Sequence, residues 1–305
     1  MYRVAILGCE NSHADGFLKA VLQDKLVEDV TFLGVYSDDR EAAQKLHDTF
    51  GVPVAEHYDD FVGKVDGILI TARHGDNHYK YAKPYLESGI PMFIDKPITC
   101  SEEDALAFMA DLKKYHVPVC GGSVCGLFQE VQELKKEVQA RPAGSVLGGY
   151  FRAPINPDNP YGGFFFYTQH LVQMMGEIFG YYPESVQMMP KDKVYTGVVR
   201  YRDFDVSICY TAESWLYFAG ISLKDGFICK ECKDFPFQEE FMEFYRLLQG
   251  QPQPHSYEDF FAPVYILNAM EESVRTGKEV RINTPSCSWA RTAATVLERQ
   301  DNQLL

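Results

Sequence analysis

The sequence predicts an α/β plus α+β protein: an N-terminal Rossmann-type doubly wound parallel sheet, followed by a C-terminal domain with an open, mainly antiparallel sheet. Two observations predict it. In the first half, short, continuously apolar runs alternate with helical patterns, which is typical of parallel strands covered on both faces. After about residue 125, strand-like segments follow one another through short turns. We therefore expect two domains, residues 1–124 and 125–305, without a flexible linker.

The elements of the first domain follow from apolar runs and their stop signals. Helix-ending glycines stand at Gly51 and Gly89, and Ser101 is a helix N-cap followed by acidic residues. The predicted strands are 3–7, 30–37, 65–72, 91–95 and 117–124, and the predicted helices include 40–50, 79–87 and 102–115.

The second domain shows a different rhythm, with turn signals at Asp203 and at Asp225-Gly226. We expect little helix between its strands, and its last helix is a candidate to pack back on the first domain. The predicted strands are 148–153, 185–189, 194–201, 206–211 and 216–223, and the predicted helices are 164–179, 237–248 and 260–275.

Composition excludes several classes of function. The formal net charge is -14, which gives no electrostatic reason to bind nucleic acid or an anionic membrane. No apolar run approaches the roughly 20 residues of a membrane span, and the polar start of the chain is unlike a signal peptide. We therefore expect a cytoplasmic protein whose eight cysteines are reduced thiols. Cys229 and Cys232 form a lone C-x-x-C, so we expect no metal there.

A glycine after the first strand suggests dinucleotide binding. A G-x-G-x-x-G run lets the backbone approach a pyrophosphate, but here only its first glycine is present. The candidate cofactor residues in this run are Gly8, Glu10, Asn11, Ser12 and His13. Glu10 stands where the second glycine belongs, and His13, near a positive helix end, is expected to be mostly neutral.

The end of the second strand carries the other nucleotide candidates, Ser37, Asp38 and Arg40. An acidic residue here can hold an adenosine ribose hydroxyl, which indicates NAD, whereas Arg40 can receive the 2′-phosphate of NADP. The alternative is that Asp38 or Asp39 caps the following helix. The choice between NAD and NADP stays open.

The stretch "FIDKPIT" places Asp95, Lys96 and Pro97 directly behind a buried strand. Proline cannot donate to a sheet ladder, so it marks the end of the strand. Lys96 is therefore expected at the lip of the sheet.

The longer segment "VDGILITARHGDNHYKYAKPYLESGIPMFIDKPIT" resembles the glucose-fructose oxidoreductase and inositol dehydrogenase (Gfo/Idh/MocA) family around its Glu-Lys-Pro motif. Asp66, His78, Gly89, Lys96 and Pro97 match the family pattern, with Asp95 in place of the usual Glu. The resemblance covers nearly the whole chain. It implies that Lys96 lies beside the nicotinamide and touches the substrate hydroxyl, where a lysine stabilises a developing alkoxide.

The resemblance also implies which residues form the cofactor side and the catalytic helix. The cofactor side takes Thr71, Ala72, His74, His78, Asp95 and Lys96. We considered a metal site at His74, Asp76 and His78, which would point the same way in an extended loop, but prefer a cofactor loop with His78 near the nicotinamide ribose.

The catalytic histidine implied by the family falls in "GGFFFYTQHLVQMMGEIFG" and is His170. Phe166, Tyr167, His170, Gln173 and Met174 share one helical face. A histidine can exchange the hydroxyl proton, and Tyr167 is its expected partner. Phe166 and Gln173 replace aspartates that many family members carry.

The expected function is that of an NAD- or NADP-dependent oxidoreductase. It would transfer a hydride between nicotinamide and a secondary alcohol of a sugar, cyclitol or polyol. The resemblance further implies a homodimer or homotetramer formed through the second sheet. The alternative is a catalytically impaired member that binds ligands or regulates, for which the altered glycine run and the missing aspartates speak.

Overall fold

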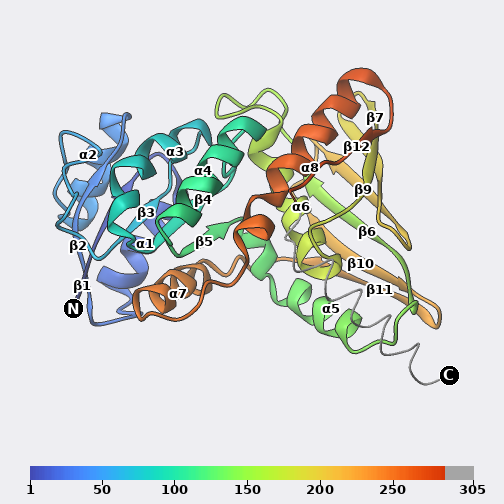
Figure 1. The fold of residues 1–305 in the computed structure, drawn as a ribbon, viewed down its shortest axis with the longest axis horizontal. Coiled ribbons are helices and arrows are strands. Elements are labelled where there is room, and N and C mark those ends of the chain that lie inside the picture. Colours follow the sequence, from blue (N-terminus) through green and yellow to red (C-terminus); the bar gives the residue numbers. More distant parts are fainter. Residues whose placement is uncertain (286–305) are drawn as a thin grey trace.

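The computed structural model describes residues 1–285, and its first sheet is parallel throughout. The strand order is β2-β1-β3-β4-β5, so the sheet is wound outward in both directions from β1 and β3 (Figure 1). The strands are β1 (Tyr2–Leu7), β2 (Val30–Tyr36), β3 (Gly67–Ile70), β4 (Met92–Asp95) and β5 (Val119–Gly122). The predicted doubly wound sheet is confirmed.

Both faces of this sheet are buried, because successive side chains of a strand point to opposite faces. In β3, Ile68 and Ile70 join one apolar cluster and Leu69 joins another; in β4, Ile94 and Phe93 divide in the same way. The covering segments are α1 (Ser12–Leu18) with a π-helical extension (Lys19–Gln23), α2 (Arg40–Phe50), α3 (Asp76–Ala82) with a 3₁₀ turn (Lys83–Ser88), and α4 (Glu102–Lys114).

The second sheet has seven strands in the order β11-β10-β6-β9-β8-β7-β12. All neighbours are antiparallel except β6 and β9, which run parallel, so the predicted mainly antiparallel sheet is also confirmed. The strands are β6 (Val146–Pro154), β7 (Ser185–Lys191), β8 (Val194–Arg200), β9 (Asp205–Thr211), β10 (Tyr217–Leu223), β11 (Gly226–Cys232) and β12 (Val280–Arg281).

One helix, α5, and two strands, β11 and β12, are absent from the sequence prediction for this half. After a 3₁₀ turn (Val124–Leu127), α5 (Gln129–Gln139) packs on α6 through Val131 and Leu134, ahead of the first strand of the second sheet. The strand β11 pairs with β10 in a hairpin. Helix α5 is mostly polar, and this concealed it from an interpretation based on apolar runs.

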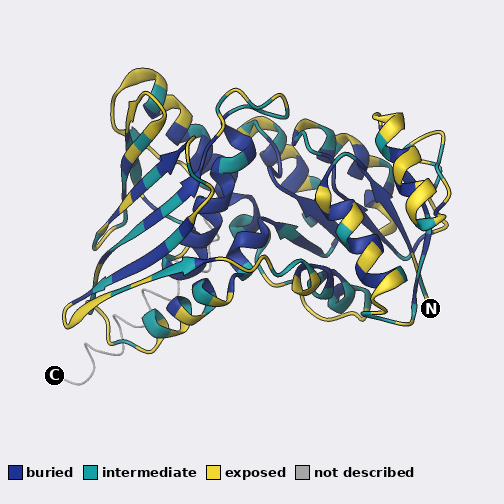
Figure 2. Cartoon of the chain, turned by 180° about the vertical axis from the view of Figure 1, so that it is seen from behind, coloured by how far each residue is buried: buried dark blue, intermediate teal, exposed yellow. Residues whose placement is uncertain are grey.

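The described residues contain three further helices: α6 (Phe165–Phe179), α7 (Phe237–Leu248) and α8 (Tyr257–Thr276). Helix α6 is buried along nearly its whole length and lies between the two sheets (Figures 1 and 2). Helix α7 returns to the first sheet, where Phe241 lies 5.7 Å from Phe17 between ring centroids. Helix α8 contacts both β7 and α4. Within residues 1–285, no helix is both long and apolar enough to cross a membrane.

Candidate active site

Two adjoining cavities lie at the carboxyl ends of the parallel strands, the edge where open α/β sheets bind ligands. The loop cavity, of about 510 Å³, is lined mainly by the segment after β1, by α2 and by Arg73 and Tyr161. The inter-sheet cavity, of about 260 Å³, lies between this edge and the second sheet. Asn11, Ser12 and Arg73 line both cavities, so the two cavities share a wall and belong to one site.

Gly8 makes the turn that opens the loop cavity. Its φ is +98°, and a Cβ at this position would lie 2.1 Å from the backbone nitrogen of Ala72. The Thr71 hydroxyl donates to the Gly8 carbonyl at 2.6 Å. Only glycine allows β1 and β3 to end this close together, so Gly8, Thr71 and Ala72 shape the site from beneath and do not line either cavity.

Glu10 is fixed by three hydrogen bonds at the wall of the loop cavity. Its carboxylate accepts from the Cys9 amide at 2.9 Å, from the Ser37 hydroxyl at 2.6 Å and from the Arg73 amide at 2.9 Å. This negative side chain therefore uses two backbone amides at the place where the fingerprint predicts phosphate binding.

Ser37, Asp38 and Arg40 do not line the loop cavity. Asp38 accepts from the Tyr36 and Tyr81 hydroxyls and from Lys80, while the Arg40 guanidinium donates to the carbonyls of residues 55 and 56. The helix-cap alternative is confirmed for Asp39, whose side chain accepts from the Ala42 amide at 3.0 Å. Asp39 and Lys45 line the cavity instead.

A buried ion cluster lies directly under the site. His13 places Nδ1 2.9 Å from Asp95 and Nε2 3.1 Å from Glu240 of α7; the second contact is an ion pair without hydrogen-bond alignment. Asp95 also accepts from the Asn11 side chain and from the Lys96 amide. Burial lowers the pKa of His13, but the two carboxylates outweigh it and raise this pKa to about 10.

The expectation of a neutral His13 is therefore wrong. The physical reason is that two buried carboxylates face the ring: Asp95 has the larger effect, and Glu240, more than 220 residues away in the chain, adds to it. Burial raises the pKa of Glu240 itself, while the neighbouring His13 opposes this effect.

Lys96 enters the inter-sheet cavity from the end of β4 and is 4 % exposed. Its Nζ lies 3.6 Å from the Phe166 ring centroid and 5.8 Å from that of Tyr167, so aromatic faces supply part of its stabilisation. Burial lowers the pKa of Lys96, Asp95 opposes this effect, and the charge of Arg73 adds to it.

His170 reaches the same cavity from α6. Its Nδ1 lies 2.7 Å from the Ser123 hydroxyl, at the end of β5, while its ring centroid is 6.0 Å from that of Tyr167. The hydrogen-bond partner of this nitrogen is thus Ser123 rather than Tyr167. Burial and the charge of Lys96 lower the pKa of His170 well below its usual range.

The rest of the predicted α6 face divides between the cavity and the protein interior. Phe166, Tyr167 and His170 line the cavity, whereas the amide of Gln173 donates to the Tyr181 hydroxyl at 2.6 Å. That hydroxyl donates in turn to Glu177. Gln173 therefore anchors α6 and does not face the cavity.

His74 and His78 both lie outside the two cavities. The expected extended loop is wrong, because α3 begins at Asp76 and turns the side chains of residues 74 and 78 apart. His78 is completely buried, and its ring nitrogens face the carbonyls of Ala72 and Ile98 at 2.7 and 3.1 Å. His78 therefore links the segment after β3 to the segment after β4 beneath the surface.

Several cavity residues escape the sequence reasoning. Arg73 stacks on Tyr161 at 4.5 Å and on Phe166 at 5.2 Å, between its guanidinium carbon and the ring centroids. Its position after a predicted strand was a usable signal. Trp215, Tyr217, Phe235 and Phe237 form the opposite wall and come from segments with no local signature.

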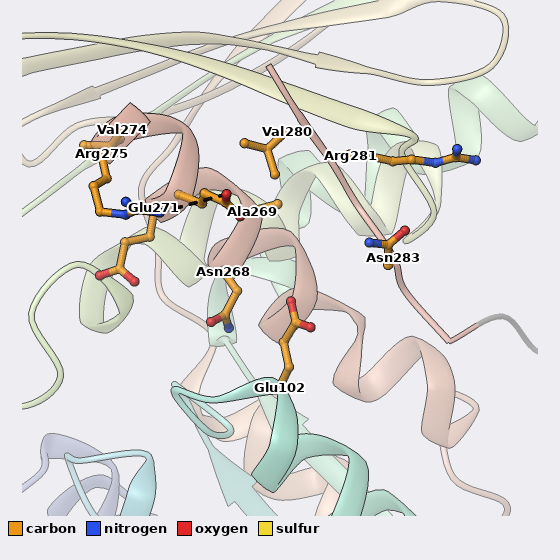
Figure 3. A pocket seen from close by; sticks show the side chains of 10 residues that line it. Glu102, Asn268, Ala269, Glu271, Val274, Arg275, Val280, Arg281 and Asn283 are labelled. Atoms are coloured by element: carbon orange, nitrogen blue, oxygen red, sulfur yellow. Dashed lines mark ion pairs between the residues drawn. The ribbon is translucent and has the colours of Figure 1, made fainter. Parts of the chain in front are cut away.

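A larger cavity, of about 680 Å³, lies between α8, β12 and the start of α4 (Figure 3). Its charged lining includes Glu102, Glu271, Arg275 and Arg281. None of the predicted catalytic or cofactor residues lines it, and we do not assign it to the site.

Residues 2–122 match the family model GFO_IDH_MocA, described as "Oxidoreductase family, NAD-binding Rossmann fold". The N-terminal domain belongs to this family. The match ends with β5, so it covers the sheet, the loop cavity and Lys96, and the family's NAD-binding Rossmann fold is the fold of this domain. No curated protein matches the sequence.

Solved structures resemble this chain over nearly its full length. Myo-inositol 2-dehydrogenase from Lactobacillus plantarum is 14% identical, with TM-score 0.80, over 92% of this chain and 99% of that chain. Scyllo-inositol dehydrogenase from Lactobacillus casei with bound NAD(H) and scyllo-inositol is 13% identical, with TM-score 0.79 and the same coverage. The WlbA dehydrogenase from Chromobacterium violaceum in complex with NADH and UDP-GlcNAcA is 16% identical, with TM-score 0.77, over 93% and 97%. These likenesses concern the fold.

Proposed function

We propose that this protein is an NAD- or NADP-dependent oxidoreductase that transfers a hydride between nicotinamide and a secondary alcohol of a sugar, cyclitol or polyol. One observation carries the proposal. Lys96, at the end of β4, and His170, on α6, line one small cavity that adjoins the loop cavity. The similar structures with inositol and nucleotide-sugar ligands support this substrate class.

The residues present fit a dinucleotide. The loop cavity is built on the Gly8 turn at the carboxyl end of β1 and opens into the inter-sheet cavity through Asn11, Ser12 and Arg73. These three residues would hold the cofactor, which supplies the hydride acceptor or donor when bound, and Glu10 would stand at the wall beside its phosphates. Arg73 brings a positive charge that offsets Glu10.

Lys96 would act on the substrate oxygen. A lysine that is 4 % exposed donates a hydrogen bond to an oxygen that gains negative charge, and this interaction is stronger in such a buried place than in water. The Asp95 carboxylate, held by His13 and Asn11, fixes the backbone of Lys96 through its amide at 2.6 Å. The lysine is thus positioned from below.

His170 would exchange the hydroxyl proton. Its lowered pKa keeps the imidazole neutral at pH 7, which is the form that accepts a proton. When Nδ1–H donates to the Ser123 hydroxyl, Nε2 keeps its lone pair for the substrate. Tyr167 would close the cavity beside it and contribute a hydroxyl.

The test is kinetic. Lys96→Ala and His170→Ala should each lower the turnover of NAD- or NADP-dependent oxidation of a cyclitol and sugar panel by about a hundredfold or more. The exposed Lys191→Ala and His57→Ala are matched controls and should retain wild-type rates. Wild-type turnover in either site variant, with its thermal unfolding unchanged, would contradict these roles.

A second candidate function rests on Glu10. Because its carboxylate uses amides that a pyrophosphate would need, the chain is also a candidate non-catalytic ligand-binding protein. Calorimetry with NADH and NADPH separates the two: measurable binding supports the oxidoreductase, whereas no binding by the wild type or by a Glu10 variant supports the alternative.

The proposed assembly is a homodimer or homotetramer that uses the second sheet. Leu147, Met189, Val194 and Phe227 are exposed large apolar side chains on four of its strands. Ultracentrifugation of the wild type and of Phe227→Lys tests this. The variant should dissociate into monomers more readily than the wild type, and a wild type that is itself monomeric would contradict the proposal.

A further inference from the structure

Three potential metal ligands of different chemistry meet beside the candidate active site. A ring nitrogen of His74, a carboxylate oxygen of Asp76 and Cys100 Sγ all lie within 4.8 Å of one another. We propose that His74, Asp76 and Cys100 form a binding site for a transition-metal dication of the Zn²⁺ type. The proposal does not rest on the oxidoreductase function.

The topology of the sheet explains why these residues meet. His74 and Asp76 follow β3, and Cys100 follows β4, the neighbouring parallel strand. Carboxyl ends of adjacent parallel strands lie at the same edge, so residues 24 positions apart come together. The sequence shows only His74, Asp76 and His78 as a group; the fold removes His78 to the interior and supplies Cys100 in its place.

Contacts that need no metal hold the two segments together. Gly75 packs so closely that a Cβ would lie 2.6 Å from the Pro97 carbonyl oxygen and 3.2 Å from Thr99 Cα. The buried His78 ring joins the start of α3 to the Ile98 carbonyl at 3.1 Å. Since the segments are fixed in advance, a metal ion pays little ordering entropy when it binds.

The candidate ligands lie close together, and the backbone of Cys100 is held in place. Asp76 lies 3.7 Å from His74 Nδ1 through a carboxylate oxygen, and Asn268 of α8 donates to the Cys100 carbonyl at 3.3 Å. Ligand atoms around a tetrahedral zinc lie about 3.3–3.8 Å apart, given bond lengths of about 2.0–2.3 Å. Side-chain adjustments of about 1 Å would close the set from its present 4.8 Å.

The donor set selects the class of metal. Thiolate and imidazole favour Zn²⁺ or Co²⁺ over Mg²⁺ and Ca²⁺, which prefer oxygen ligands. A thiolate and a carboxylate would neutralise the dication, while the thiol proton leaves to solvent. Three protein ligands leave a fourth position for water. The ion would clip the loop that carries Arg73 to the segment that carries Lys96.

The test is Co²⁺ titration of the full-length, untagged, reduced protein under anaerobic conditions. The wild type should bind one Co²⁺ with thiolate-to-metal charge-transfer absorption, and Zn²⁺ should displace it. Cys100→Ser should lose this absorption, and His74→Ala and Asp76→Asn should each weaken Co²⁺ binding by about tenfold or more. Cys229→Ser, which removes an exposed thiol on the second sheet, is the matched control and should behave as wild type.

Three outcomes would overturn the proposal. They are no charge-transfer absorption in the wild type, the same absorption in Cys100→Ser, and unchanged Co²⁺ affinity in both His74→Ala and Asp76→Asn. Zn²⁺-dependent thermal stabilisation of the wild type, absent from Asp76→Asn, gives a second readout that does not depend on a cysteine substitution. Inactivity of the protein towards every polyol would leave these results unaffected.

Discussion

Glu10→Gln should strengthen the binding of a nicotinamide dinucleotide. In the wild type, the Glu10 carboxylate is tethered at the loop cavity by Cys9, Ser37 and Arg73, so it cannot turn to solvent without losing three hydrogen bonds. A phosphate held in this cavity would therefore face a fixed negative charge. The isosteric amide removes the charge and keeps the volume.

The expected magnitude follows from Coulomb's law. At about 6 Å, two unit charges repel by ~0.7 kcal/mol in water-like surroundings and by ~3 kcal/mol at an effective dielectric of 20. These energies correspond to roughly threefold and roughly a hundredfold in Kd. Glu10 is partly exposed, so we expect about tenfold tighter binding at low salt and a smaller gain at high salt.

The same substitution should cost stability. A glutamine has one carbonyl oxygen where the carboxylate has two, so at least one of the three donors loses its acceptor, at about 1–2 kcal/mol. Tighter binding together with lower stability is a combined signature that a general improvement of the fold would not produce.

The assay is isothermal calorimetry with NADH at two salt concentrations. Asp203→Asn, which removes one exposed charge from the turn before β9, is the control for net charge and should bind as the wild type does. Equal NADH affinity of wild type and Glu10→Gln at low salt would refute the reasoning, because it would place the phosphates away from this carboxylate.

Three further predictions follow from the site. Tyr167→Phe should depress turnover with little loss of stability, because the ring and its apolar area remain; an unchanged pH–rate profile would remove the hydroxyl from the mechanism. The raised pKa of His13 gives stability that is present below about pH 6.5 and lost as the pH rises through about 10. In Glu240→Gln, the free energy of unfolding measured with urea should begin to fall at a lower pH than in the wild type. The same dependence on pH in both proteins would contradict the ion cluster. Burial raises the pKa of Glu177, but His255 and Lys135 outweigh it and lower the pKa to about 2. Glu177→Gln should therefore cost up to about 3 kcal/mol at pH 7 and much less at pH 3, and a cost independent of pH would contradict this account.

The sequence by itself determined the architecture and the position of Lys96. Continuous apolar runs such as residues 67–70 indicated strands buried on both faces, and Pro97 marked the end of β4, because these signals depend only on local chemistry. The resemblance then placed Lys96 and His170, and the structure brings both to one cavity. Cys287 and the rest of residues 286–305 lie outside the described residues.

Only the tertiary structure decided how the site residues are charged and paired. His13 is cationic because Asp95 and Glu240 of α7 both face its ring, and His170 is oriented by Ser123, directly after β5. Cys100 joins His74 and Asp76 because β3 and β4 are neighbours in the sheet. Ionisation, hydrogen-bond partners and ligand sets depend on distances of a few ångströms between residues far apart in the chain, and a single sequence carries no record of those distances.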